Sequence, residues 1–193
     1  NALQQLSNMH RKNFEIPVLA ITGTNGKTTT KEMIVRVLQK RYVVHGTHGN
    51  LNNHIGVPLT LLSMPKNTEI AVVEMGANHI GEIDFLCSLA MPDFGIITNI
   101  GKAHLEGFGS IDGVVKAKGE LYDYLGEMGG TIIINKDNLL LSEMVGGTEQ
   151  FSYGTSNGAN VFGLIRNIDQ KSFYTVLAYQ SLWLYMKIIY LKV

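Results

Sequence analysis

Residues 16–30 have the sequence IPVLAITGTNGKTTT, and this stretch decides the fold. Its apolar residues from Val18 to Ile21 predict a buried parallel strand. The strand is followed by the turn TGTNG at 22–26, and Lys27 then opens an amphipathic helix. A glycine-bearing turn between a strand and a helix N-terminus suits phosphates, because backbone N–H groups and the helix dipole face the anion. We therefore predict a phosphate-binding loop, the alternative being an ordinary strand-to-helix turn with a surface lysine.

The spacing of this loop departs from the general pattern. Phosphate-binding loops commonly follow G-x-x-x-x-G-K-[ST], in which the lysine reaches the β- and γ-phosphates and the next hydroxyl suits Mg²⁺. Lys27 and Thr28 match these last two positions, whereas Ile21 stands where the first glycine is expected. The residues themselves therefore match the general motif only in part.

Composition excludes several classes of protein. The sixteen basic and sixteen acidic residues give no formal net charge, so nothing favours nucleic acid as a partner. The 45% hydrophobic content is typical of a globular chain with a substantial core. Cys87 is the single cysteine, which excludes an internal disulfide and suits a reducing compartment. Residues 1–13 lack the apolar segment of a signal peptide, and we expect a cytoplasmic protein.

Strand and helix patterns alternate along the chain. We expect further strands at 42–45, 69–75, 94–99 and 131–135, and helices at 2–12, 27–40, 57–63, 80–90, 110–125 and 138–145. In the helix at 27–40, a core-facing stripe is expected from Met33, Ile34, Val37 and Leu38. The alternation predicts an α/β fold, a mostly parallel sheet with helices on both faces. Ligands bind beyond the carboxyl ends of such strands, which is where the sequence places Gly23, Glu74, Asn99 and Asn135.

The end of the chain is mostly apolar. Residues 173–191 are long enough to span a membrane, but Gln180, Ser181 and Lys187 interrupt the run. We therefore favour two alternating edge strands or a packed terminal helix over a membrane span.

Polar residues stand at positions where a buried sheet would not place them for stability alone. They lie in GNLNNHIGVPLTLL (49–62), EMGANHIGEI (74–83), TNIGKAHLEGFGS (98–110) and GVVKAKGELYDYL (113–125). Together with ITGTNGKTTTKEM (21–33), these stretches resemble the Mur ligases, which build the peptidoglycan peptide, over about residues 2–160. The nearest resemblance is to the members that add D-alanyl-D-alanine to UDP-N-acetylmuramoyl-tripeptide. The altered loop spacing at Ile21 is itself the form found in this family.

The resemblance implies an ATP-dependent ligase of peptidoglycan synthesis. Such enzymes use ATP and Mg²⁺ to convert a carboxylate into an acyl phosphate, which an amine then attacks. The resemblance further implies a lead-in helix at 1–14, a central P-loop-containing ATP-binding domain at 15–170 and an apolar tail at 171–193. Because the family has further domains before and after the central one, we expect this chain to be part of a longer protein and not to complete the reaction alone. The alternatives are another Mur-type ligase, a folylpolyglutamate synthase-like ligase, or a nucleotide-binding module without catalysis.

The resemblance also implies roles for individual residues. The ATP-binding residues would be Gly23, Thr24, Asn25, Gly26, Lys27, Thr28 and Thr29. The catalytic residues would be Lys27, Glu74, His104 and Lys118, and Mg²⁺ would be held by Thr28, Glu74, His104 and Lys118, the last as a carbamate. The tripeptide substrate would be lined by Asn50, Asn52, Asn53, Asn78 and His79.

Each role has a simpler alternative. Glu74 could cap the turn that follows its strand, His104 could be a solvated loop histidine, and the asparagines could be turn residues. Lys118 could be a solvated helix lysine, although Lys116 and Glu120, four residues apart, suit local pairing better.

Overall fold

The computed structural model describes residues 2–101, 105–155, 158–165 and 177–179, which form one sheet with flanking helices. Its strands are β1 (Val18–Thr22), β2 (Val44–Gly46), β3 (Ile70–Glu74), β4 (Phe94–Ile97), β5 (Thr131–Asn135), β6 (Gln150–Gly154), β7 (Val161–Ile165) and β8 (Leu177–Tyr179). Its helices are α1 (Ala2–Arg11), α2 (Lys27–Leu38), α3 (Gly56–Leu62), α4 (Glu82–Ala90), α5 (Leu105–Phe108), α6 (Ile111–Met128) and α7 (Leu139–Met144). The predicted α/β fold is confirmed.

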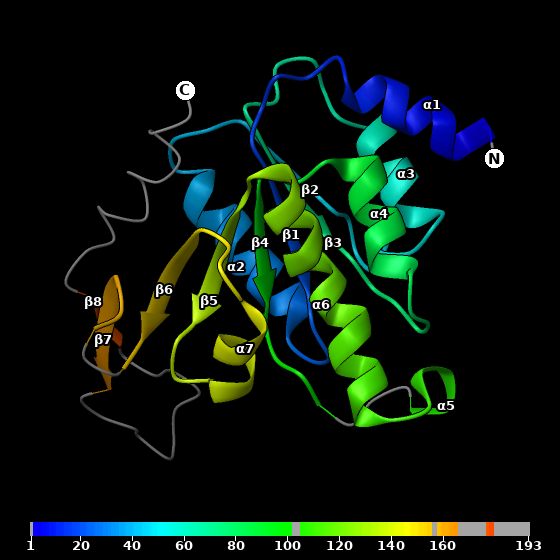
Figure 1. The fold of residues 1–193 in the computed structure, drawn as a ribbon. Coiled ribbons are helices and arrows are strands. Elements are labelled where there is room, and N and C mark those ends of the chain that lie inside the picture. The colour runs from blue at the N-terminus through cyan, green and yellow to red at the C-terminus, as the bar shows by residue number, and fades with distance from the viewer. Residues whose placement is uncertain (1, 102–104, 156–157, 166–176, 180–193) are drawn as a thin grey trace.

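The sheet has the strand order β2-β3-β1-β4-β5-β6-β7-β8. All pairs from β2 to β7 are parallel, and β8 pairs with β7 in the antiparallel direction. Because β1 lies between β3 and β4, the chain leaves β1 toward one side of the sheet and later continues on the other side. Such a switch point opens a crevice at the carboxyl ends of the strands. In Figure 1 the arrowheads of β4, β5 and β6 point to this edge, on the side of the molecule where α5 lies.

Helices cover both faces of the sheet. On one face, α3, α4, α6 and α7 contribute to the larger core cluster, as shown by Leu61, Leu86, Leu121 and Leu141, all at most 1% exposed. On the other face, α2 packs over a smaller cluster that includes Ile21, Val72 and Ile96. Figure 1 shows α6 in front of the sheet and α2 behind it.

Local sequence accounts for the position of α6. The Ser110 hydroxyl accepts a hydrogen bond from the Gly113 amide at 3.1 Å, which caps the first turn, and Gly129 ends the helix with a left-handed φ of 71°. The buried stripe of the helix continues through Val114, Ala117, Lys118, Leu121, Tyr122 and Leu125. Lys118 therefore lies in a row of core residues, at the helical spacing that faces the sheet.

The predicted core stripe of α2 is wrong in part. Ile34 and Leu38 pack against the sheet, but Met33 is 63% exposed and Val37 is 50% exposed. Lys31 is instead fully buried, at 1% exposure. The side of α2 that faces the sheet therefore carries Lys31, Ile34 and Leu38. Lys31 can be buried there because carbonyl oxygens inside the protein accept hydrogen bonds from its ammonium.

The end of the chain is described only at 158–165 and 177–179. The strands β6 and β7 were not predicted, because glycine or serine interrupts the apolar pattern of each. Most of the apolar run at 173–191 lies outside the described residues, so the two arrangements expected for it stay predictions. None of the helices in the described part of the chain is long and apolar enough to cross a membrane.

Candidate functional site

The predicted phosphate loop lies at the switch point of the sheet, between the end of β1 and the start of α2. Gly23 has a φ of 136°, and a Cβ there would come within 2.0 Å of the Thr98 hydroxyl, so only glycine fits. Gly26 takes the N-cap position of α2 with a φ of 78°. It brings no side chain over the first-turn amides, which can therefore face an anion.

Lys27 folds back against this loop. Its ammonium donates to the carbonyl oxygens of Gly23 at 2.8 Å and Thr24 at 3.2 Å. Burial lowers the pKa of Lys27, and the negative charge of Glu74 acts in the opposite direction. Lys27, the first residue of α2, and Glu74, the last residue of β3, therefore lie close enough to interact electrostatically.

The segment after β4 holds the phosphate loop in shape. The Asn99 side chain accepts from the Asn25 amide and donates to the Asn25 carbonyl, both at 3.0 Å. The Thr98 hydroxyl donates to the same carbonyl at 2.7 Å, and the Thr24 hydroxyl accepts from the Gly101 amide at 2.9 Å. Asn99 stood out in the sequence only as a polar residue at a strand end. Its two-point contact with Asn25 depends on the parallel pairing of β1 with β4.

The Glu74 carboxylate is the buried acidic group of the site, with an exposure of 1%. The β1–β3 register pairs Glu74 with Ile21, the residue directly before the turn at 22–26. One carboxylate oxygen, Oε1, accepts from the Asn52 amide group at 2.8 Å. The other, Oε2, is buried without a hydrogen-bond partner. Because a buried, unpaired carboxylate oxygen is unfavourable, this atom fits a cation ligand better than it fits a turn cap.

A glycine makes the contact between Asn52 and Glu74 possible. A Cβ on Gly76 would come within 2.8 Å of the Asn52 side-chain oxygen. The Gly76 amide donates to the Asn52 carbonyl at 2.7 Å. Asn52 therefore lies against the end of β3 with both its backbone and its side chain.

Lys118 approaches the same edge of the sheet from α6. It is 3% exposed, its ammonium donates to the Ala77 carbonyl at 3.4 Å, and it lies 5.5 Å from the centre of the Phe108 ring. Burial, and to a smaller extent the charge of Lys27, lower its pKa to about 8, although Glu82 and Glu120 act in the opposite direction. The alternative of a solvated helix lysine is therefore wrong for Lys118.

The sequence suggests that Glu120 pairs with Lys116 on the same helix, but the Glu120 carboxylate binds mainly to the start of α4. Its carboxylate accepts from the amides of Gly81 at 2.6 Å and Asp84 at 3.0 Å. It therefore caps the start of α4 from the neighbouring helix α6.

The remaining predicted substrate residues surround this cluster at the surface. Asn53 accepts from the amides of Ile55 and Gly56 and so starts α3, as the turn alternative predicts. Asn50 is exposed. The amides of Asn78 and His79 donate to Glu82, and the His79 ring lies 3.3 Å from the same carboxylate.

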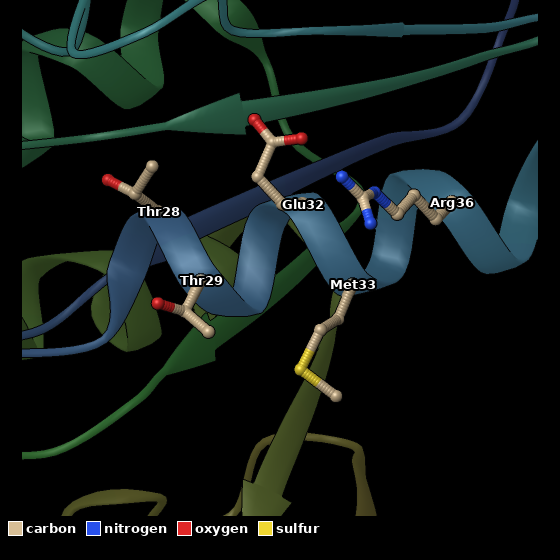
Figure 2. A pocket seen from close by; sticks show the side chains of 5 residues that line it. All are labelled: Thr28, Thr29, Glu32, Met33 and Arg36. Atoms are coloured by element: carbon tan, nitrogen blue, oxygen red, sulfur yellow. The ribbon is translucent and has the colours of Figure 1, made fainter. Parts of the chain in front are cut away.

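The predicted metal ligands are only partly described. Thr28 and Thr29 are exposed on the first turn of α2, where with Glu32, Met33 and Arg36 they line an open depression of about 340 Å³ (Figure 2). His104 lies outside the described residues. Within the described ranges, no three His, Cys, Asp or Glu side chains are grouped so that they could hold a metal ion. The buried, unpaired Oε2 atom of Glu74 is therefore the structural observation that supports a cation site.

Comparison with known proteins identifies the family of this chain. The family model of the Mur ligase middle domain matches residues 21–188, which extends beyond the motifs found in the sequence. The UDP-N-acetylmuramoyl-tripeptide--D-alanyl-D-alanine ligase of Bacillus subtilis is 49% identical over 81% of this chain and 34% of its own length.

Solved structures show the same relationship. MurF from Acinetobacter baumannii has a TM-score of 0.75 at 38% identity, covering 84% of this chain and 36% of the other. MurF ligase from Thermotoga maritima in complex with ADP has a TM-score of 0.77 at 33% identity, covering 84% of this chain and 38% of the other. The chain spans about a third of the length of these relatives. With its phosphate loop at the switch point and a family match over most of its length, the chain belongs to the Mur ligase family and carries the middle domain of that family.

Proposed function

We propose that the complete protein is an ATP-dependent ligase that joins D-alanyl-D-alanine to UDP-N-acetylmuramoyl-tripeptide. The observation that carries this proposal is the juxtaposition of the phosphate loop with the Glu74 carboxylate, of which one oxygen is held by Asn52 and the other is unpaired. The relatives with this activity by name support the choice of substrates. The solved relative that binds ADP supports the use of ATP.

The reaction follows from the chemistry of acyl phosphates. The tripeptide carboxylate attacks the γ-phosphorus of ATP, which forms an acyl phosphate and releases ADP. The amine of D-alanyl-D-alanine then attacks the acyl carbon, and phosphate leaves as the amide bond forms. Lys27 and the first-turn amides of α2 would bind the phosphates and stabilise the charge that develops on them.

Mg²⁺ would be held by Glu74 and Thr28, with His104 and Lys118 as further ligands. When bound, the ion neutralises phosphate charge and orients the reacting oxygens. Glu74 fits this role because its free oxygen is buried and Asn52 orients the carboxylate.

Lys118 would take part as a carbamate formed with CO₂. The neutral amine attacks CO₂, and the proton lost from nitrogen passes to solvent, which leaves a carboxylate on a long side chain. Burial and the nearby Lys27 charge favour the neutral amine that this step needs. Replacing Lys118 with Ala in the complete protein should abolish most turnover, and a short-chain carboxylate should restore part of it. Near-normal turnover of the variant would contradict the role of Lys118.

The function is tested by phosphate release from MgATP by the complete protein. We expect release only when both UDP-N-acetylmuramoyl-tripeptide and D-alanyl-D-alanine are present, with one amide product formed per phosphate. Turnover with a folate and glutamate, or with another amino acid as the amine, would instead support the related ligases. Nucleotide binding without phosphate release under any of these conditions would indicate a module without catalysis.

A further inference from the structure

Lys31 is a fully buried lysine one helical turn beyond Lys27. Its ammonium donates to the carbonyl oxygens of Thr47 at 2.6 Å and Gly49 at 3.2 Å, and lies 3.0 Å from the Glu32 carboxylate. These three acceptors match the three N–H donors of an ammonium group. Because a buried charge is unfavourable unless it is fully paired, an apolar side chain would fill this position more easily. What the lysine adds, and an apolar side chain could not, is hydrogen bonding to the backbone of residues 47–49.

The segment held by Lys31 continues directly to Glu74. The Thr47 amide donates to the Val72 carbonyl at 3.0 Å, and the Thr47 hydroxyl accepts from the Glu74 amide at 2.9 Å. Five residues later, the Asn52 side chain holds the Glu74 carboxylate. Lys31 and Asn52 thus fix the two ends of residues 47–52, and both fixed points lie against the end of β3.

We propose that Lys31 is a positioning residue that anchors residues 47–53 to the nucleotide-binding helix α2. Through this anchor it sets the position of Asn52, the orientation of the Glu74 carboxylate and the shape of the surface offered to the tripeptide substrate. The proposal rests on the proposed function, because it assigns residues 50–53 to the tripeptide side of the site. It differs from a purely stabilising role in that loss of the anchor affects the tripeptide more than the nucleotide.

The variants Lys31→Met, Thr47→Val and Glu32→Gln separate these roles. Lys31→Met keeps the length of the side chain but removes all three N–H donors. Thr47→Val removes the acceptor for the Glu74 amide and leaves the Thr47 carbonyl available to Lys31. Glu32→Gln is the matched control, because the Glu32 side chain is 52% exposed and glutamine keeps an oxygen that can accept from Lys31, while both carbonyl contacts of Lys31 stay in place.

Steady-state kinetics of the complete protein give the first readout. We expect Lys31→Met to raise the KM for UDP-N-acetylmuramoyl-tripeptide by about tenfold, the scale of one lost hydrogen bond at the surface that binds the tripeptide. Thr47→Val should raise the same KM, and Glu32→Gln should leave it unchanged. The Kd for MgATP, measured by calorimetry, should change less than the tripeptide KM in Lys31→Met and Thr47→Val, because Lys27 and the first-turn amides of α2 remain in place, and it should stay within about twofold in Glu32→Gln. An unchanged tripeptide KM in Lys31→Met, or an equal loss of nucleotide affinity, would overturn the proposal.

Hydrogen exchange of the complete protein gives a readout that is independent of activity. Lys31→Met should speed exchange across residues 47–52 and at the Glu74 amide, and Glu32→Gln should not. Unchanged exchange in Lys31→Met would refute the anchor. If the complete protein releases no phosphate with the tripeptide, the proposed function fails, whereas the exchange measurement still decides whether Lys31 holds this segment.

Discussion

Lys27 and Lys118 both approach the phosphate loop, and their surroundings differ. Lys27 is half-buried and bonded to the carbonyls of its own loop, whereas Lys118 is almost fully buried with one long contact to a carbonyl. These environments suit a phosphate-binding cation in the first case and an amine that readily loses its proton in the second.

The role of Lys27 predicts a specific loss of nucleotide affinity. Lys27→Ala should weaken MgATP binding by roughly 1.5–3 kcal/mol, the scale of a charge-assisted hydrogen bond to phosphate. Isothermal calorimetry on the complete protein measures this change. Lys116→Ala is the control, because Lys116 is exposed on α6. Equal affinities of wild type and Lys27→Ala would remove Lys27 from the phosphate site.

The lowered pKa of Lys118 predicts a pH dependence of stability. Its pKa is about 8 in the folded chain against the ordinary lysine value of 10.5, so between these values the unfolded chain binds a proton that the folded chain does not. The free energy of unfolding should therefore rise as the pH increases from about 8 to 10, by at most about 3 kcal/mol from this residue.

Lys118→Met isolates this contribution. Urea unfolding of both chains in CO₂-depleted buffer at several pH values should show the difference between wild type and variant growing in favour of wild type above pH 8. Parallel stability curves for the two chains would contradict the lowered pKa.

At the scale of secondary structure, the phosphate loop depends on the segment that follows β4. Asn99 makes two hydrogen bonds to the backbone of Asn25, and Thr98 makes a third. The Asn25 amide is thereby occupied inside the protein. The anion-binding amides must therefore come from Gly26 and the first turn of α2.

Asn99→Ala should consequently weaken MgATP binding without altering any residue of the loop itself. Loss of two neutral hydrogen bonds predicts an effect of about 1–3 kcal/mol, measured by calorimetry on the complete protein. Asn67→Ala, in an exposed turn, should bind MgATP normally. Wild-type affinity in Asn99→Ala would show that the loop keeps its shape without this contact.

At the scale of the whole molecule, α1 is attached to the sheet domain through Arg11. This side chain is 6% exposed and donates to the carbonyls of Ala90 at 2.8 Å and Met91 at 3.2 Å, at the end of α4. It also donates to the carbonyls of Phe14 at 2.6 Å and Ile16 at 3.4 Å, in the segment that enters β1. One guanidinium group thus joins the first helix, the first strand and α4.

Arg11→Met should lower the free energy of unfolding by about 2–4 kcal/mol, because buried carbonyls lose charged donors. Urea unfolding of the 193-residue chain measures this effect, with the exposed Lys12→Met as control. A stability loss no larger than that of the control would show that Arg11 is not needed to hold α1 against the domain.

The sequence by itself determined the α/β class, most element positions and the phosphate loop, because these depend on local patterns: buried apolar runs, helical periodicity and the glycine-bearing turn. Family-specific motifs around Glu74 and Lys118 further pointed to the site residues. The tertiary structure decided what depends on distant segments. Examples are the hydrogen bonds between Asn99 and Asn25 and the hydrogen bond from Asn52 to Glu74. A third is α2, where Lys31 is buried whereas Met33 and Val37, which were expected to face the core, are exposed. The hydrophobic pattern of a helix does not by itself fix which residues face the core. For α2 this depends on the carbonyls of Thr47 and Gly49, which bind Lys31 and lie on another part of the chain.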